Sequence, residues 1–198
     1  MKETDFYLEV AEKLKREFTT DDLDVAYAIG GEKNLDAVVK DIQSQKKHKI
    51  DFAKIAYVPK IRIDILFSIR NNKTKETTPL LLEVKYAEQL KLMDYSQMVG
   101  YLHTSGFINN GILVLVPKPS KSNVLSNDLS ELLALNAIHF HYQEQNADGS
   151  NLRNIRTGMM TYDPGGRFRN PLGEPNQRHL GNMEILKEFI NKQNYLLI

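Results

Sequence analysis

The alternation of apolar and polar residues predicts a β-hairpin in the middle of the chain. From 61 to 69 and from 80 to 86 every second residue is apolar, as expected for two strands that each bury one face. The polar segment 71–78 between them has the composition of a loop. The two apolar rows are Ile61, Ile63, Ile65, Phe67 and Ile69, and then Leu80, Leu82, Val84 and Tyr86.

The register of this hairpin is restricted because both apolar rows must face the same side. Pairing Asp64 with Glu83 satisfies this condition and centres the turn between Lys73 and Thr74, inside the polar loop. A slip of two residues would place Asp64 opposite Lys85 instead and would keep every side chain on its face. A slip of one residue would turn the isoleucines outward and is disfavoured. Both acceptable registers bring two acids and a lysine together on one face.

The rest of the pattern predicts an α/β fold. Apolar residues at helical spacing predict helices near 5–18, 35–43, 88–103, 127–135 and 182–192, and a further strand is expected near 138–143. The uninterrupted apolar run from Gly111 to Val116 is typical of a central strand with helices on both of its faces. We therefore expect a three-layer sandwich with a central mixed β-sheet.

Length and composition add limits to this expectation. A chain of 198 residues is expected to form a single domain, residues 1–198. The 26 Lys and Arg residues nearly balance the 25 Asp and Glu residues, so any attraction to nucleic acid must be local. The chain has no cysteine, which excludes disulfides and thiolate metal sites. No apolar run approaches the roughly 20 residues that span a bilayer, and we expect a cytoplasmic protein without membrane association.

The charged face of the hairpin is the strongest chemical signal. In the first register the Cβ atoms of Asp64 and Glu83 would be roughly 4.5–5.5 Å apart, so the two carboxylates would repel. A hard divalent cation such as Mg²⁺ would remove that repulsion because it prefers carboxylate oxygens as ligands. An amine on Lys85 could reach a phosphate or a water beside the cation. Such a set is suited to phosphodiester hydrolysis.

These residues resemble the motif of the PD-(D/E)XK nuclease superfamily, which places an acid near the end of one strand and Glu/Asp-x-Lys on the next. Asp64 and the tripeptide Glu83-Val84-Lys85 match in order and in strand context. Many members also carry Gln-x-x-x-Tyr on the following helix, which here corresponds to Gln97 and Tyr101. The residue before Asp64 is isoleucine, where the motif has proline. The resemblance implies a restriction-endonuclease-like fold.

The resemblance also implies a function and a set of site residues. The protein would be a Mg²⁺-dependent nuclease, with Mn²⁺ as a substitute, and its substrate would be DNA in restriction, repair or defence. Asp64, Glu83 and the backbone carbonyl of Val84 would hold the cation, and Lys85 would complete the catalytic set. Gln97 and Tyr101 would brace the site or contact substrate. The family often adds an acid on its first helix, and Glu17, at the edge of that helix's apolar arc, is our candidate.

The segment 146–181 is predicted to be a long loop rich in arginine. Its arginines lie among aromatic residues, a combination suited to phosphate contact and base stacking, and Arg167 and Arg169 are the candidates for substrate contact. The same composition suits an ordinary surface loop braced by ion pairs. We expect contact with nucleic acid because it agrees with the nuclease hypothesis.

Two alternative functions remain open. The same fold could serve as a nucleic-acid-binding or subunit-interaction module that does not cut, and a homodimer or a partner subunit is compatible with either role. The chain could instead be an unrelated α/β protein in which Glu83 and Lys85 form a surface ion pair. Leu81 lies on the face of Glu83, which makes full exposure of that pair less favourable.

Overall fold

The computed structural model describes residues 1–45, 48, 59–119, 123–145, 152–163, 165–172 and 179–192. Its strands all belong to one mixed sheet with the order β1-β2-β3-β4-β6-β5, and β7 pairs with β6. The strands are β1 (Leu23–Ile29), β2 (Ile65–Asn71), β3 (Thr77–Ala87), β4 (Asn110–Pro117), β5 (His141–Gln145), β6 (Leu152–Asp163) and β7 (Arg167–Arg169). The pairs β3–β4 and β4–β6 are parallel, and the other pairs are antiparallel.

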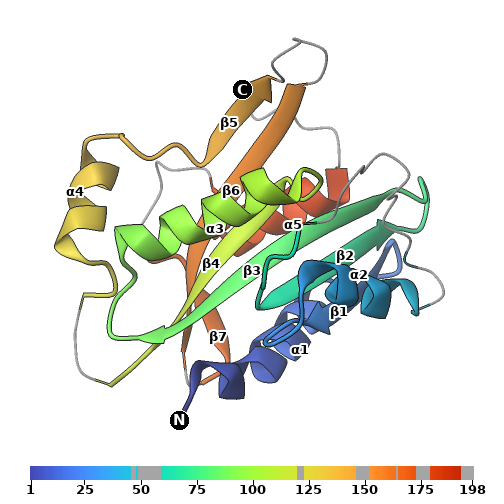
Figure 1. Cartoon of the computed structure of the whole chain (residues 1–198), viewed down its shortest axis with the longest axis horizontal. Coiled ribbons are helices and arrows are strands. Elements are labelled where there is room, and N and C mark those ends of the chain that lie inside the picture. The colour runs from blue at the N-terminus through green and yellow to red at the C-terminus, as the bar shows by residue number, and fades with distance from the viewer. Residues whose placement is uncertain are drawn as a thin grey trace.

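Helices cover both faces of this sheet (Figure 1). A short 3₁₀ helix, Glu3–Phe6, leads into α1 (Tyr7–Phe18); the others are α2 (Leu35–Gln43), α3 (Leu92–Ser105), α4 (Asn127–Ala134) and α5 (Met183–Lys192). The helices α1 and α5 pack on one face, and α2, α3 and α4 pack on the other. The predicted α/β layering with a mixed central sheet is confirmed. None of the described helices is long and apolar enough to cross a membrane.

The central strand β4 is buried on both faces, as its continuous apolar run predicts. Ile112, Val114 and Val116 join the core beneath α1 and α5, whereas Leu113 and Leu115 join the core beneath α2, α3 and α4. Alternating side chains of one strand therefore contribute to two separate cores.

The predicted hairpin register is confirmed, but its first strand begins later than predicted. Ile65 pairs with Leu82 and Leu66 with Leu81, so Asp64 lies one position beyond the last pair, facing Glu83. Residues 61–64 leave β3 and follow the turn after β1, where Gly30 N donates to the Asp64 carbonyl at 2.7 Å. Ile63 consequently packs beneath α2 and does not join the row of Ile65.

A close contact between the backbones of Gly30 and Ile63 determines the path of residues 61–64. A Cβ atom on Gly30 would lie 1.9 Å from the carbonyl oxygen of Ile63, a distance that no side chain can tolerate. Glycine at position 30 therefore lets the segment before β2 cross the end of β1 and brings Asp64 to the edge of β3.

The predicted loop at 146–181 is wrong for residues 152–163 and 167–169, which form β6 and β7. β6 is a central strand of 12 residues between β4 and β5. Its polar side chains interrupt the apolar pattern, so the sequence does not predict a strand there. Arg153, for example, donates to the carbonyls of Leu102 and Ile108 near the end of α3. Residues 146–151, 164 and 173–178 of that segment lie outside the described residues.

Candidate active site

The candidate site lies where β2 begins and β3 extends past it, paired there with β4 only. Pairing with β2 stops at Leu82, while β3 runs on to Ala87. Two backbone N–H groups on this edge are satisfied by carboxylates: Val84 N donates to Asp64 Oδ2 at 2.8 Å, and Tyr86 N donates to Glu3 Oε2 at 3.2 Å. The open edge of β3 thus fixes two acids side by side.

Tyr7, in the first turn of α1, connects the two acids. Its hydroxyl donates to Asp64 Oδ1 at 2.5 Å and lies 3.3 Å from Glu3 Oε1. The side chain is buried in the core beneath α1, so the hydroxyl is held in place by packing. Together with the N–H of Val84, it fixes both oxygens of Asp64.

Glu83 and Lys85 form a buried ion pair next to Asp64. Lys85 Nζ donates to Glu83 Oε1 at 2.8 Å, and the side chains are only 16% and 3% exposed for Lys85 and Glu83, respectively. This burial excludes a surface position for the ion pair. The second oxygen of Glu83, Oε2, is buried and has no hydrogen-bond partner among the described residues. An ionised carboxylate with an unsatisfied buried oxygen is costly, so the position favours a ligand.

The pKa values in the cluster are shifted because several acids lie close together and are buried away from water. Burial, followed by repulsion from Asp64, raises the pKa of Glu83 to about 7. Burial also raises the pKa of Asp64, although the hydrogen bonds from Tyr7 and Val84 oppose the change. Burial alone would lower the pKa of Lys85, but the carboxylates of Glu83, Glu3 and Asp64 outweigh it and raise that pKa. Lys85 therefore carries a positive charge at neutral pH.

Burial and the hydrogen bond to Asp64 raise the pKa of Tyr7 above its ordinary value. The hydroxyl therefore remains protonated and acts as a donor toward the acids.

Glu17, the predicted acid of the first helix, is not part of this cluster. It lies about 15 Å along α1 from Tyr7, at 1.5 Å per residue, and pairs with Lys13 and Lys187. The predicted helix began near residue 5, whereas residues Glu3–Phe6 form a 3₁₀ turn and α1 begins only at Tyr7. Glu3, on that turn, is the acid that reaches the site.

The other predicted substrate residues are placed in two regions. Gln97 Nε2 donates to the hydroxyl of Tyr101 at 2.6 Å on α3, so the pair acts as a unit. Among the described residues, no hydrogen bond or ion pair joins that pair to Asp64, Glu83 or Lys85. Arg167 and Arg169 lie on β7, where Arg169 Nε pairs with Asp163 at 2.5 Å.

Sequence reasoning missed Glu3 and Tyr7. Their spacing of four residues suggests a shared side of a helix, which is the only local signal they carry. Their contacts with Asp64 and Tyr86 span 57 and 83 positions of sequence. No pattern within the first helix indicates which strand edge it will meet.

The donor set at the site suits Mg²⁺. Within the described residues, no group of three or more His, Cys, Asp and Glu is arranged to hold a metal ion. Mg²⁺, however, is usually bound through one or two carboxylates and keeps several waters. The unpartnered Oε2 of Glu83 and the remaining lone pairs of Asp64 supply such ligands. In a strand, the C=O and N–H of a residue point to the same neighbour, so the Val84 carbonyl points to the side on which Asp64 lies.

No protein-family model matches this chain, and comparison with curated proteins gives no significant match.

Proposed function

We propose that this protein is a Mg²⁺-dependent nuclease that hydrolyses phosphodiester bonds in DNA. The observation that carries the proposal is the buried cluster of Asp64, Glu83 and Lys85, with an unsatisfied oxygen on Glu83. The arrangement of these residues supports a PD-(D/E)XK-type site on a restriction-endonuclease-like fold. An acid directly precedes one strand, Glu-x-Lys lies on the next, and a helix with Gln97 and Tyr101 follows.

The side chains would divide the work as follows. Asp64, Glu83 and the carbonyl of Val84 would hold the cation, which would polarise the phosphodiester and lower the pKa of a bound water. Tyr7 and the N–H of Val84 orient Asp64.

Lys85, charged and held by Glu83, would stabilise the negative charge that develops on the phosphate. Gln97 and Tyr101 would contact the substrate strand from α3.

A cleavage assay tests the proposal directly. Single- and double-stranded DNA and RNA are incubated with the protein in Mg²⁺, Mn²⁺ or EDTA, and the products are separated by size. We expect cleavage of DNA in Mg²⁺ and Mn²⁺ and none in EDTA. Failure to cut any of the substrates in either metal, while still binding them, would favour the non-cutting module instead.

The variant Lys85→Ala identifies the site responsible. We expect it to lower the cleavage rate by about 10²-fold or more, as for loss of a group that stabilises transition-state charge, and to bind DNA like the parent. Lys91→Ala, which removes a lysine from the N-terminus of α3, is the control and should cut normally. Equal rates for Lys85→Ala and the parent protein would exclude the assigned site.

A further inference from the structure

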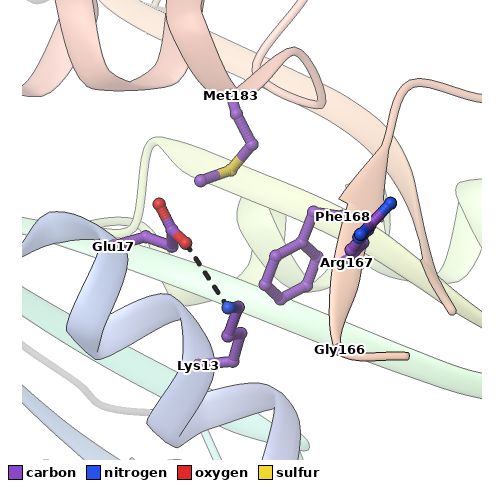
Figure 2. A pocket seen from close by; sticks show the side chains of 6 residues that line it. All are labelled: Lys13, Glu17, Gly166, Arg167, Phe168 and Met183. Atoms are coloured by element: carbon purple, nitrogen blue, oxygen red, sulfur yellow. Dashed lines mark ion pairs between the residues drawn. The ribbon is translucent and has the colours of Figure 1, made fainter. Parts of the chain in front are cut away.

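A cavity of about 260 Å³ lies between α1, the β6–β7 hairpin and α5, away from the acidic cluster (Figure 2). We refer to it as the α1–β7 cavity. Its walls come from three elements distant in sequence. Its lining residues are Lys13, Glu17, Gly166, Arg167, Phe168 and Met183.

Positive charge exceeds negative charge around this cavity. Among the described residues that line it, Glu17 is the one acid, and it lies 2.8 Å from Lys187 Nζ and 3.7 Å from Lys13 Nζ, so its charge is already balanced. Arg167 is exposed and makes no ion pair with any described residue, unlike Arg169, which pairs with Asp163. The surplus charge suits an anionic ligand.

An aromatic ring forms one wall of the cavity. Phe168 is half-buried, and Figure 2 shows its ring lying close to Lys13 and Met183. Tyr162 supports the ring from the sheet at a centroid distance of 4.9 Å, and the Tyr162 hydroxyl donates to Glu9 on α1 at 2.7 Å. The ring is therefore held in place before any ligand arrives. A fixed aromatic surface beside an arginine that has no ion-pair partner among the described residues suits a ligand with both a flat ring and a phosphate.

We propose that the α1–β7 cavity receives one unpaired nucleotide of the substrate strand, with its base against Phe168 and its phosphate at Arg167. The inference rests on the proposed nuclease function. The volume is slightly below the roughly 300–1,000 Å³ of typical small-molecule pockets, which suits one nucleotide better than a larger cofactor. A base inside a duplex is paired and stacked, and extruding it costs a few kcal/mol, so a single strand or a frayed end supplies it most readily.

The position of the cavity fits a strand that also reaches the acids. Lys13 and Glu17 lie about 9 and 15 Å along α1 from Tyr7, which contacts Asp64. At 3.4 Å per stacked nucleotide, that separation corresponds to about three to four nucleotides. The substrate class that follows is single-stranded DNA, or duplex DNA with an unpaired end.

Binding of labelled oligonucleotides tests this inference. Fluorescence anisotropy is measured in EDTA with a single strand and with a blunt duplex of equal length. We expect Phe168→Leu, which keeps an apolar side chain but removes the stacking surface, to weaken single-strand binding by about 5-fold or more. Phe168→Tyr should restore it, and duplex binding should not change. Thermal melting verifies that each variant is folded.

The two arginines of β7 provide a matched comparison. Arg167→Ala should weaken single-strand binding and reduce the slope of log K against log salt by about 0.7, the value for one phosphate contact on a single strand. Arg169→Ala, whose side chain is paired with Asp163, should leave the slope unchanged. Unchanged single-strand binding in either Phe168→Leu or Arg167→Ala would overturn the inference, and so would equal losses in Arg167→Ala and Arg169→Ala.

This test and the cleavage assay can fail independently. If the parent protein cuts DNA but Phe168→Leu binds single strands normally, the subsite is wrong and the nuclease proposal stands. If the parent protein never cuts in Mg²⁺ or Mn²⁺ but the variants lose single-strand binding as expected, the subsite stands and the nuclease proposal is wrong.

Discussion

At the scale of single residues, the site is defined by acids that are held close together at a cost. Asp64 and Glu83 could be identified from the sequence because their strand positions placed them on one face. The residues that stabilise them could not be identified in the same way. Tyr7 contacts Asp64 from a helix 57 positions away, and that contact depends on how α1 packs on the sheet.

The raised pKa of Glu83 predicts a pH-dependent loss of stability. A group with a pKa of about 7 in the folded protein and 4.5 when unfolded binds its proton more tightly in the folded state. Its stabilising contribution is therefore complete below pH 4.5 and is lost as the pH rises through 7, by about 3 kcal/mol. Glu83→Gln should lack this loss when urea unfolding is followed in EDTA from pH 4.5 to 8. Parallel pH profiles for the two proteins would contradict the assignment.

Tyr7 should affect cation binding through Asp64. Tyr7→Phe removes a donor from a buried carboxylate, so we expect a loss of about 1–3 kcal/mol of stability and about 10- to 100-fold weaker Mg²⁺ binding. Tyr162→Phe is the matched control, because Tyr162 also donates to an acid on α1, Glu9, but away from the cluster. Calorimetric titration with Mg²⁺ measures the affinity of each variant, and urea unfolding measures its stability. Equal affinities for the Tyr7→Phe variant and the parent would show that Tyr7 does not orient a ligand.

At the scale of elements, the hairpin was predictable and the central strand β6 was not. The register of β2 and β3 follows from alternation because a slip of one residue would expose the isoleucine row. β6 carries Arg153, Thr157 and Gly158 at positions where a central strand usually has apolar residues. Their partners lie elsewhere in the fold: Arg153 bonds the end of α3, and Gly158 makes room for the backbone of Gly181. The periodicity of one segment does not contain such information.

The close approach of Gly30 to the segment before β2 should not tolerate even one added methyl group. Gly30→Ala would place a Cβ 1.9 Å from the Ile63 carbonyl oxygen, so the segment that carries Asp64 must move. We expect a destabilisation of about 1–3 kcal/mol and weaker Mg²⁺ binding, measured by urea unfolding and calorimetry. Gly100→Ala on α3 meets nothing within 4 Å and should stabilise the protein by about 0.5–1 kcal/mol. A Gly30→Ala protein with parental stability and Mg²⁺ affinity would refute this account.

At the scale of the whole molecule, distant segments are joined by a few buried polar contacts. His179 is an example: its Nδ1 accepts from Gly181 N at 3.0 Å, and its Nε2 lies 3.0 Å from Asn170 Oδ1. The neutral ring thus ties the segment before α5 to the segment after β7. The layered architecture could be predicted from the pattern of apolar runs. Buried hydrogen bonds such as those of His179 could not be predicted, because they depend on where irregular segments of the chain meet.

His179 should make the molecule sensitive to acid. Burial lowers its pKa to about 4 from an ordinary value of 6.5. The unfolded chain therefore gains a proton first as the pH falls, and stability should fall between pH 6.5 and 4 by about 3 kcal/mol from this group. Urea unfolding across this range should show a smaller pH dependence for His179→Asn than for the parent. An unchanged pH dependence in the variant would exclude His179 as its source.

The carboxylates on the open edge of β3 have a consequence for how copies of the protein meet. Unpaired N–H groups along a strand are templates for joining another chain, and here Asp64 and Glu3 occupy those of Val84 and Tyr86. A protein stripped of both acids would present two neighbouring donors to any extended segment that approached. The two carboxylates thus also keep this edge from pairing with another strand, so a variant that lacks both Asp64 and Glu3 should aggregate more readily than the parent.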